Sequence, residues 1–306
     1  MSIVVSGASG DLGKRITALL LQHLPASRLI LLTRNPAALQ ALAAQGAQVR
    51  KADFDDTAAL QQAMKGGEVL MLISTLSIGK RAQQHANAIK AAVAAGIGHI
   101  VYTSSCGIQP QTPSISGQEH LATERLLQRS GVKYTILRNS WYADVIAQLL
   151  LPMGVATGSI VASTGDGLVA PVAKDDCARI AAGVLRKPWQ HENAIYEVTG
   201  PELLSFADIT RICSEESGRP IRHVNVSHQE KLAIFDAMGV QRDYEEGMMN
   251  ENTNAWASNE MITYEMAIRR QFFAVCSNHV GLVTGHRPLT LREVIRSAES
   301  SQIQSA

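Results

Sequence analysis

Three glycines near the start of the chain stand where a backbone would hold phosphate groups. Gly7, Gly10 and Gly13 follow the apolar run 3–5, and a helical pattern begins after them. In such a strand, turn and helix, the glycines allow a tight turn, close approach of phosphates and close helix packing. The helix N-terminus adds N–H donors and partial positive charge. We therefore expect a dinucleotide pyrophosphate against the backbone of Gly7, Ala8, Ser9, Gly10, Asp11, Leu12 and Gly13, with the Asp11 side chain turned outward or capping the helix.

The end of the second predicted strand indicates which dinucleotide is bound. An NAD site usually has Asp or Glu there, roughly 20 residues after the glycines, to accept a hydrogen bond from the ribose 2′-hydroxyl. This chain has Thr33, Arg34 and Asn35 instead. A guanidinium at this position suits a 2′-phosphate, because it can make two charge-assisted hydrogen bonds to it. We therefore predict that the protein binds NADP(H) and that Arg34 binds its 2′-phosphate. The alternative is a solvated arginine at a strand end.

Other polar residues follow later predicted strands. Asp53 is expected near the adenine or else in an ordinary turn, and Ser74 and Thr75 either lie on the cofactor's path or cap the next segment. Thr103 and Ser104 are expected near the nicotinamide, since ligands of open parallel sheets lie beyond the carboxyl ends of the strands. Tyr102, within the strand, is expected in the core.

The sixth predicted strand is followed by a polar and aromatic group. Asn139 is expected to bind the nicotinamide carboxamide or the backbone of a facing loop. Trp141 and Tyr142 are predicted to form an apolar wall against a planar substrate ring. The alternative is that Trp141 packs only at a seam between lobes.

Alternating strands and helices must position these residues. Apolar strand patterns joined through helices by short turns predict right-handed crossovers and a Rossmann-type, doubly wound parallel sheet of the α/β class. After residue 140 the pattern loosens into a smaller mixed α/β lobe. We predict an NADP-binding domain over 1–155, with later segments returning to it, and a substrate-binding lobe over 156–306. The strands after the first are expected at 28–33, 47–52, 68–73, 99–103 and 134–138.

Composition excludes several classes of function. The 306 residues are 46% hydrophobic and 18% charged, and the net charge of +1 gives no general attraction to nucleic acid or anionic membranes. No apolar run reaches the roughly 18–20 residues of a membrane helix, and a strand beginning at Ile3 leaves no room for a signal peptide. Four distant cysteines form no CxxC pair, so neither a metal site nor a disulfide framework is expected. These features predict a cytoplasmic protein with reduced thiols and a small-molecule substrate; a homodimer remains open.

Several segments together resemble one known family. They are Gly7–Gly13 (GASGDLG), Thr33–Pro36 (TRNP), Gln84–Asn87 (QHAN), Tyr102–Ser104 (YTS) and Tyr134–Asn139 (YTILRN). This series resembles the NmrA-like, atypical branch of the short-chain dehydrogenase/reductase superfamily, particularly bacterial NADPH:quinone oxidoreductases and triphenylmethane-dye reductases. The resemblance covers most of 1–225 and is weaker over 228–285.

One departure from the superfamily concerns proton transfer. Ordinary members carry Tyr-x-x-x-Lys on the helix after the fifth strand, and here His120 and Glu124 take those places. The related isoflavone-reductase-like enzymes have a catalytic lysine at about the position of His120. Lack of the Tyr/Lys pair argues against alcohol dehydrogenation and sugar epimerisation. His120, expected to have a pKa near neutrality, would donate a proton or a hydrogen bond to the acceptor; the alternative is a histidine on the helix surface.

The resemblance implies an NADPH-dependent oxidoreductase that reduces a quinone-like or other conjugated small molecule by direct hydride transfer. Such a reaction depends mainly on proximity and orientation. The alternative is a non-catalytic NADP(H)-binding redox sensor of the NmrA type. A third possibility, a reductase of plant phenolics, would need His120 to replace the lysine.

Overall fold

The computed structural model describes residues 1–245 and 257–305, which form two compact units. Unit 1 comprises Met1–Ser104, Glu119–Arg138 and Cys177–Tyr196. Unit 2 comprises Ser105–Gln118, Asn139–Asp176 and Glu197–Ala306. The units interleave along the chain, so no single boundary such as residue 155 separates them. Segment Cys177–Tyr196 returns late in the chain to unit 1.

A seven-stranded sheet organises unit 1. Its order, β3-β2-β1-β4-β5-β6-β9, is that of a Rossmann-type sheet extended by one strand. The first two strands and β4 are buried along their whole length, as expected for strands covered on both faces. The strands are β1 (Ile3–Val5), β2 (Leu29–Thr33), β3 (Gln48–Lys51), β4 (Val69–Leu72), β5 (His99–Ser105), β6 (Lys133–Asn139) and β9 (Ala194–Val198).

The strand register places the carboxyl ends of β1, β2 and β4 at one edge. The pairs β1–β2, β1–β4, β2–β3 and β4–β5 are all parallel, with Val5 opposite both Leu31 and Met71. From β1 the chain adds β2 and β3 on one side of the sheet, and then β4, β5 and β6 on the other side. The order in which strands are added therefore reverses between β1 and β4. Ligands of doubly wound sheets bind at such a switch point, which here lies directly after Val5.

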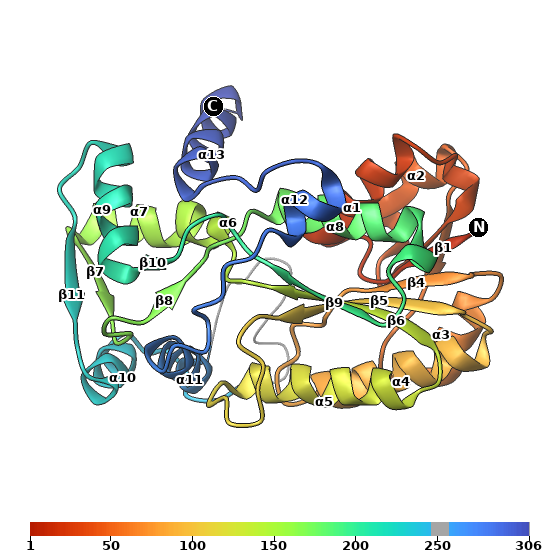
Figure 1. The fold of residues 1–306 in the computed structure, drawn as a ribbon, viewed down its shortest axis with the longest axis horizontal. Coiled ribbons are helices and arrows are strands. Elements are labelled where there is room, and N and C mark those ends of the chain that lie inside the picture. Colours follow the sequence, from red (N-terminus) through yellow and green to blue (C-terminus); the bar gives the residue numbers. More distant parts are fainter. Residues whose placement is uncertain (246–256, 306) are drawn as a thin grey trace. The chain divides into compact units, whose positions relative to one another are not determined.

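Helices cover both faces of this sheet. In Figure 1, α3, α4 and α5 lie on one face and α1 and α8 on the other. Leu60 of α3, Ile89 of α4 and Leu127 of α5 share one buried cluster with Ile100 of β5. The helices are α1 (Asp11–Leu21), α2 (Gln40–Ala44), α3 (Thr57–Met64), α4 (Arg81–Ala94), α5 (Ile115–Arg129) and α8 (Lys174–Arg186), with 3₁₀ turns η1 (Ala26–Arg28), η2 (Pro36–Leu39) and η4 (Pro188–Gln190).

Unit 2 combines helices with two-stranded sheets. Its helices α9 and α10 begin at reciprocal capping boxes, Ser205 with Asp208 and Ser227 with Glu230. Its strands are β7 (Ser159–Ala162), β8 (Leu168–Val169), β10 (Leu204–Ser205) and β11 (Arg222–Asn225), and its helices are α6 (Ala143–Val145), the π-helix η3 (Ile146–Leu150), α7 (Leu151–Thr157), α9 (Phe206–Ser217), α10 (His228–Ala237), α11 (Ser258–Arg269), α12 (His279–Thr284) and α13 (Leu291–Ser305).

The predicted parallel sheet and its crossover helices are confirmed. The segment after Asn35 begins as a 3₁₀ turn, and α2 starts only at Gln40.

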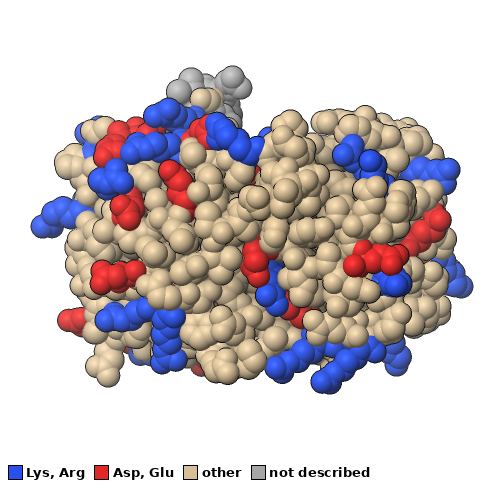
Figure 2. All heavy atoms as spheres, viewed as in Figure 1, with Lys and Arg blue, Asp and Glu red and all other residues tan. Residues whose placement is uncertain are grey.

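All four cysteines are free thiols, and three of them are buried. In the described part of the chain, no helix combines the length and apolar character needed to span a bilayer. Nor do the described residues contain a group of three or more side chains suited to hold a metal. Basic and acidic side chains are interspersed on the face shown in Figure 2.

Candidate active site

The glycine turn between β1 and α1 has the backbone geometry that the sequence predicts. Gly7 has a φ of +61°, a backbone conformation that is unfavourable for residues with a Cβ atom. The residue is exposed to solvent. A Cβ on Gly13 would lie 2.3 Å from the Gly7 carbonyl oxygen, and one on Gly10 would lie 3.3 Å from the same atom. The turn is therefore a cradle that side chains would fill. It leads into an eleven-residue helix whose first N–H groups lack intrahelical acceptors. These features fit a pyrophosphate.

Hydrogen bonds hold the turn against its neighbours. The buried Ala8 donates its N–H to Leu32 O at 3.1 Å, and the Ser9 and Thr33 hydroxyls are 2.8 Å apart. Asp11 is exposed and accepts a hydrogen bond from Arg15 Nε at 2.8 Å, so its predicted outward orientation is confirmed. Leu12 is half-buried in the first turn of α1.

Ser6 joins the two strands at the switch point. Its hydroxyl donates to Met71 O and accepts from the N–H of Ile73, both at 3.0 Å. Beyond β4, the N–H of Ser74 donates to Thr103 Oγ1 at 2.9 Å. Thr103 is buried, and its hydroxyl lies 3.4 Å from Ser74 Oγ. The ends of β1, β4 and β5 are thus tied together at the edge where a dinucleotide is expected.

Arg34 directly follows β2 and is exposed. Among the described residues its guanidinium has no hydrogen-bond or ion-pair partner. Thr33 Oγ1 accepts from the N–H of Asn35 at 3.0 Å and shapes the turn. Asp53 is exposed and accepts from the N–H of Asp55 at 3.1 Å, which is an ordinary turn interaction. A free guanidinium after β2 fits a phosphate on the ribose, whereas Asp53 has a local role already.

His120 lies on the sheet-facing side of α5. Its ring is 7% exposed, and its Nδ1 lies 2.6 Å from the hydroxyl of the fully buried Tyr102. Burial, reinforced by the positive charge of Arg81, holds the pKa of His120 well below its usual value. The expected pKa near neutrality and the alternative of a surface histidine were therefore both wrong. Tyr102 is in the core, as predicted.

A second buried histidine, His85 of α4, connects the loop after β4 to α5. Its Nε2 accepts from the N–H of Thr75 at 3.1 Å, and its Nδ1 lies 3.0 Å from Thr123 Oγ1. Thr123 donates its own hydroxyl proton to Glu119 O at 2.9 Å, so Nδ1 of His85 is the donor to Thr123. Burial lowers the pKa of His85 to about 3. The Thr75 hydroxyl is enclosed and has no partner among the described residues.

One buried ion pair adds charge beside these histidines. Arg81, at the start of α4, donates from Nε to Thr75 O at 2.7 Å, and its Nη1 lies 3.4 Å from Glu119 Oε2. The other carboxylate oxygen of Glu119 accepts from the N–H of Gly79 at 2.8 Å. Burial nevertheless raises the pKa of Glu119. The cation near His120 therefore comes from α4 and not from its own helix.

Glu124, which the sequence comparison predicts in the place of the superfamily's lysine, is hydrogen-bonded inside unit 1. Its carboxylate accepts from Ser104 Oγ at 2.7 Å and from Arg138 Nε and Nη2 at 2.9 and 2.6 Å. Only 2% of its side chain is exposed. Ser104, expected near the nicotinamide, thus directs its hydroxyl to Glu124. Neither His120 nor Glu124 is in a state to remove a proton from a substrate alcohol.

The predicted residues at the end of β6 and directly after it belong to unit 2. Asn139 is buried, and its Nδ2 donates to the Tyr142 hydroxyl at 3.3 Å, while its Oδ1 has no partner among the described residues. The Trp141 ring stacks on Phe206 with centroids 5.3 Å apart, and Lys174 Nζ lies 5.6 Å from the centre of the Tyr142 ring. Both aromatic side chains remain partly exposed.

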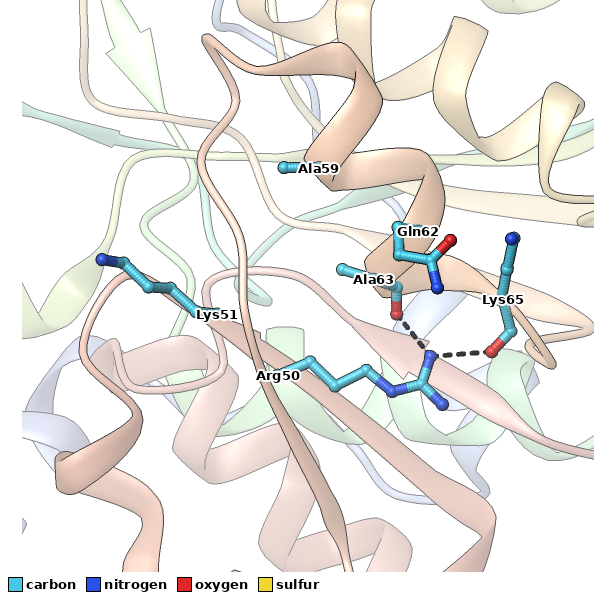
Figure 3. Close-up of a pocket in the computed structure, with 6 residues that line it drawn as sticks. All are labelled: Arg50, Lys51, Ala59, Gln62, Ala63 and Lys65. Carbon is cyan, nitrogen blue, oxygen red and sulfur yellow. Dashed lines mark hydrogen bonds between the residues drawn. The ribbon is translucent and has the colours of Figure 1, made fainter.

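A surface hollow of about 510 Å³ beside β3 is unrelated to these residues (Figure 3). Arg50 lines the hollow, and its guanidinium donates hydrogen bonds to the backbone carbonyls of Ala63 and Lys65, both at 2.7 Å. These carbonyls end α3, so Arg50 serves as a helix cap. The Lys51 side chain extends away from Arg50. We therefore assign the hollow no ligand.

Sequence reasoning missed Arg81, His85 and Arg138. The spacing of four residues between Arg81 and His85 puts them on one helix face, which was an available signal. Arg138 stands four residues into a predicted strand and gave no such signal.

Comparisons with known proteins show which family model and which solved structures this chain resembles. Residues 7–188 match the model of a protein family described as NAD(P)H-binding. Quinone oxidoreductase 2 of Escherichia coli is 37% identical over 78% of this chain and 82% of its own. The crystal structure of an E. coli NADPH-dependent quinone oxidoreductase complexed with NADPH has a TM-score of 0.86 at 32% identity, covering 97% of this chain and 99% of that one. Triphenylmethane reductase of Citrobacter sp. complexed with NADP(H) has a TM-score of 0.84 at 31% identity, covering 97% and 100%.

Proposed function

Because the chain belongs to the NAD(P)H-binding family, we propose that this NADPH-dependent oxidoreductase reduces a quinone-like or other conjugated small molecule by direct hydride transfer. The relatives named above act on quinones and triphenylmethane dyes, according to their names. Both acceptors are conjugated molecules that take a hydride without first losing a proton.

The observation that carries this proposal is the state of the two side chains in place of the Tyr/Lys pair. His120 is buried beside Tyr102, and Glu124 is neutralised by Arg138. Neither is a strong base, so neither side chain is suited to accept the proton that an alcohol loses on oxidation. Reduction of an electron-poor ring has no such requirement and depends on proximity and orientation.

The cofactor contacts follow from the turn and the strand ends. NADPH supplies the hydride when bound. We assign the pyrophosphate to the backbone of Gly7–Gly13 and the 2′-phosphate to Arg34, while Ser74 and Thr103 border the expected nicotinamide end. Trp141 and Tyr142 are our candidates for contact with the acceptor ring.

A substrate panel tests the proposal. Purified protein is incubated with NADPH or NADH and a series of benzoquinones, naphthoquinones and triphenylmethane dyes, and absorbance of the reduced nicotinamide is followed. We expect acceptor-dependent loss with NADPH and a much smaller rate with NADH. No loss with any acceptor at any pH would contradict the proposal.

A redox sensor of the NmrA type is the alternative outcome. It would bind oxidised and reduced cofactor with similar affinity, show no turnover and co-purify with a protein partner. Calorimetric titration with NADP⁺ and NADPH, made on the same preparation, distinguishes the two functions.

Location and assembly complete the proposal. We propose a cytoplasmic protein, supported by free cysteines and by the finding that no described helix could span a membrane. A homodimer is the assembly to test first. Cell fractionation and light scattering of the purified protein measure the two properties.

A further inference from the structure

We propose that Tyr102 is a positioning residue that holds His120 as the neutral tautomer with its hydrogen on Nε2. His120 then serves the reduction as a hydrogen-bond donor to the oxygen of the acceptor and not as an acid. The second statement rests on the proposed function, whereas the tautomer does not depend on any acceptor.

The contact length indicates which atom carries the hydrogen. Tyr102 Oη and His120 Nδ1 are 2.6 Å apart. That is shorter than the usual N–H···O range and lies within the range of hydroxyl donors. The phenol is fully buried, and burial raises the pKa of Tyr102. Tyr102 therefore donates, Nδ1 accepts, and a neutral imidazole has its hydrogen on Nε2.

Nε2 is the ring nitrogen available to a ligand. It has no hydrogen-bond partner among the described residues, and it is not one of the enclosed polar atoms without a partner. The small exposed fraction of His120, 7%, is compatible with access at this edge of the ring. Tyr102 is the central residue of β5, and it stands opposite Leu72, the last residue of β4. The pair therefore lies beside the carboxyl end of β4, where substrates of such sheets bind.

The hydrogen bonds among the described residues give His120 no route to a new proton. Close to the Tyr102 and His120 pair, a separate chain of hydrogen bonds runs from Thr123 through His85 and ends at the N–H of Thr75. A backbone amide does not supply protons. These hydrogen bonds can orient side chains but cannot return a proton to His120 after it has lost one. We therefore infer that the proton for the reduced acceptor comes from solvent.

Charges around the ring also disfavour the imidazolium. Arg81 and His85 face it from α4, Tyr102 faces it from β5, and Glu119 belongs to its own helix. Arg81 is partly compensated by Glu119 at 3.4 Å, and Glu124 by Arg138. Burial is the largest effect on the His120 ring, and it favours the neutral form because a charged imidazolium would lose its hydration.

Nitrogen-15 NMR of the whole protein tests the tautomer directly. Histidine ring nitrogens are labelled, and the His120 signals are assigned by their loss in His120→Gln. We expect the pattern of a neutral ring with hydrogen on Nε2, unchanged from pH 6 to 8. Hydrogen on Nδ1, or titration within this range, would overturn the proposal whether or not any acceptor is reduced.

Three substitutions at position 120 separate a donor from an acid. Glutamine places an amide N–H near the position of Nε2, asparagine places one near Nδ1, and alanine has neither. We expect kcat to fall about tenfold in His120→Ala and His120→Asn, the value of one hydrogen bond, and at most about threefold in His120→Gln. A loss in His120→Gln as large as in His120→Ala would overturn the donor role.

Tyr102→Phe tests the positioning role. We expect a fall in kcat of about three- to tenfold with little change in KM, and a mixture of His120 tautomers by NMR. The control is Thr135→Val, which removes the 2.8 Å contact to the buried His99 elsewhere in unit 1 and should leave kcat and the His120 signals unchanged. Wild-type tautomer and kcat in Tyr102→Phe would overturn the assignment.

Discussion

The Glu124 carboxylate accepts two hydrogen bonds from the Arg138 guanidinium, at 2.9 and 2.6 Å, where the superfamily would have a lysine near its tyrosine. The carboxylate is enclosed, whereas Arg138 retains 20% exposure. This pair joins α5 to β6 within unit 1, and a carboxylate at position 124 does not supply the positive charge that a lysine would bring to a neighbouring proton donor.

Breaking this pair should be costly for folding. Arg138→Met leaves a buried carboxylate without its cation, and we expect the free energy of unfolding to fall by about 3–5 kcal/mol. Urea denaturation measures the change. Arg211→Met, which breaks exposed pairs with Asp208 and Glu215, is the control and should cost less than about 1 kcal/mol. Equal, small losses of unfolding free energy in Arg138→Met and Arg211→Met would show that the buried Glu124 carboxylate does not depend on Arg138.

Arg34→Ala should change cofactor preference. Loss of a charge-assisted contact to the 2′-phosphate is expected to weaken NADPH binding by about 1.5–3 kcal/mol while leaving NADH binding nearly unchanged. Titration of both cofactors measures this difference. Arg129→Ala, an exposed arginine at the end of α5, is the matched control. If the affinities for NADPH and NADH fell equally, Arg34 would not be the residue that binds the 2′-phosphate.

Gly13→Ala should damage the cradle itself. Its Cβ would lie 2.3 Å from Gly7 O, so either the turn or α1 must shift. We expect NADPH affinity to fall at least tenfold, since the turn must approach the pyrophosphate closely. Gly98→Ala is the control, because a Cβ there meets its nearest atom at an ordinary 3.7 Å. Wild-type affinity in Gly13→Ala would exclude close approach at this turn.

Buried histidines predict sensitivity to acid. Burial lowers the pKa of His85 to about 3 and of His99 to about 4, below the unfolded value near 6.5. The unfolded chain therefore binds more protons as pH falls below 6.5. Their contribution to stability is complete above that pH and is lost progressively toward pH 4, by about 1.4 kcal/mol per pH unit for each histidine.

Urea midpoints between pH 7.5 and 5 measure this loss. His99→Gln keeps an N–H donor near the position of Nε2 but cannot titrate, so its stability should fall less steeply with acid than that of the wild type. An identical dependence in both proteins would show that His99 is not the buried neutral base described here.

The sheet and the glycine turn were predictable because their causes are local. Gly7 needs a positive φ, Gly13 needs space against Gly7, and both requirements are visible in residue type and spacing. Arg34 was predicted to bind the 2′-phosphate because a short turn after a buried strand leaves few positions for a side chain that contacts the ribose.

The environment of His120 was not predictable in the same way. Its burial depends on packing of α5 against β5, which brings together residues 18 apart in sequence. Arg81 reaches the same region from a different helix, and Glu124 finds its partner 14 residues away across a turn. Such contacts depend on the tertiary arrangement of crossovers, so residue type alone suggested an ordinary pKa and left a position on the helix surface as an alternative.

The central claim is most directly tested in a single turnover. Flavin-free protein is loaded with one equivalent of NADPH that carries deuterium at the transferred position, and a naphthoquinone is mixed in under anaerobic conditions. We predict that nicotinamide oxidation depends on the quinone, is slower than with unlabelled NADPH and needs no flavin. Bound NADPH that stays reduced with quinones and dyes alike, or oxidation that requires added flavin, would contradict direct hydride transfer.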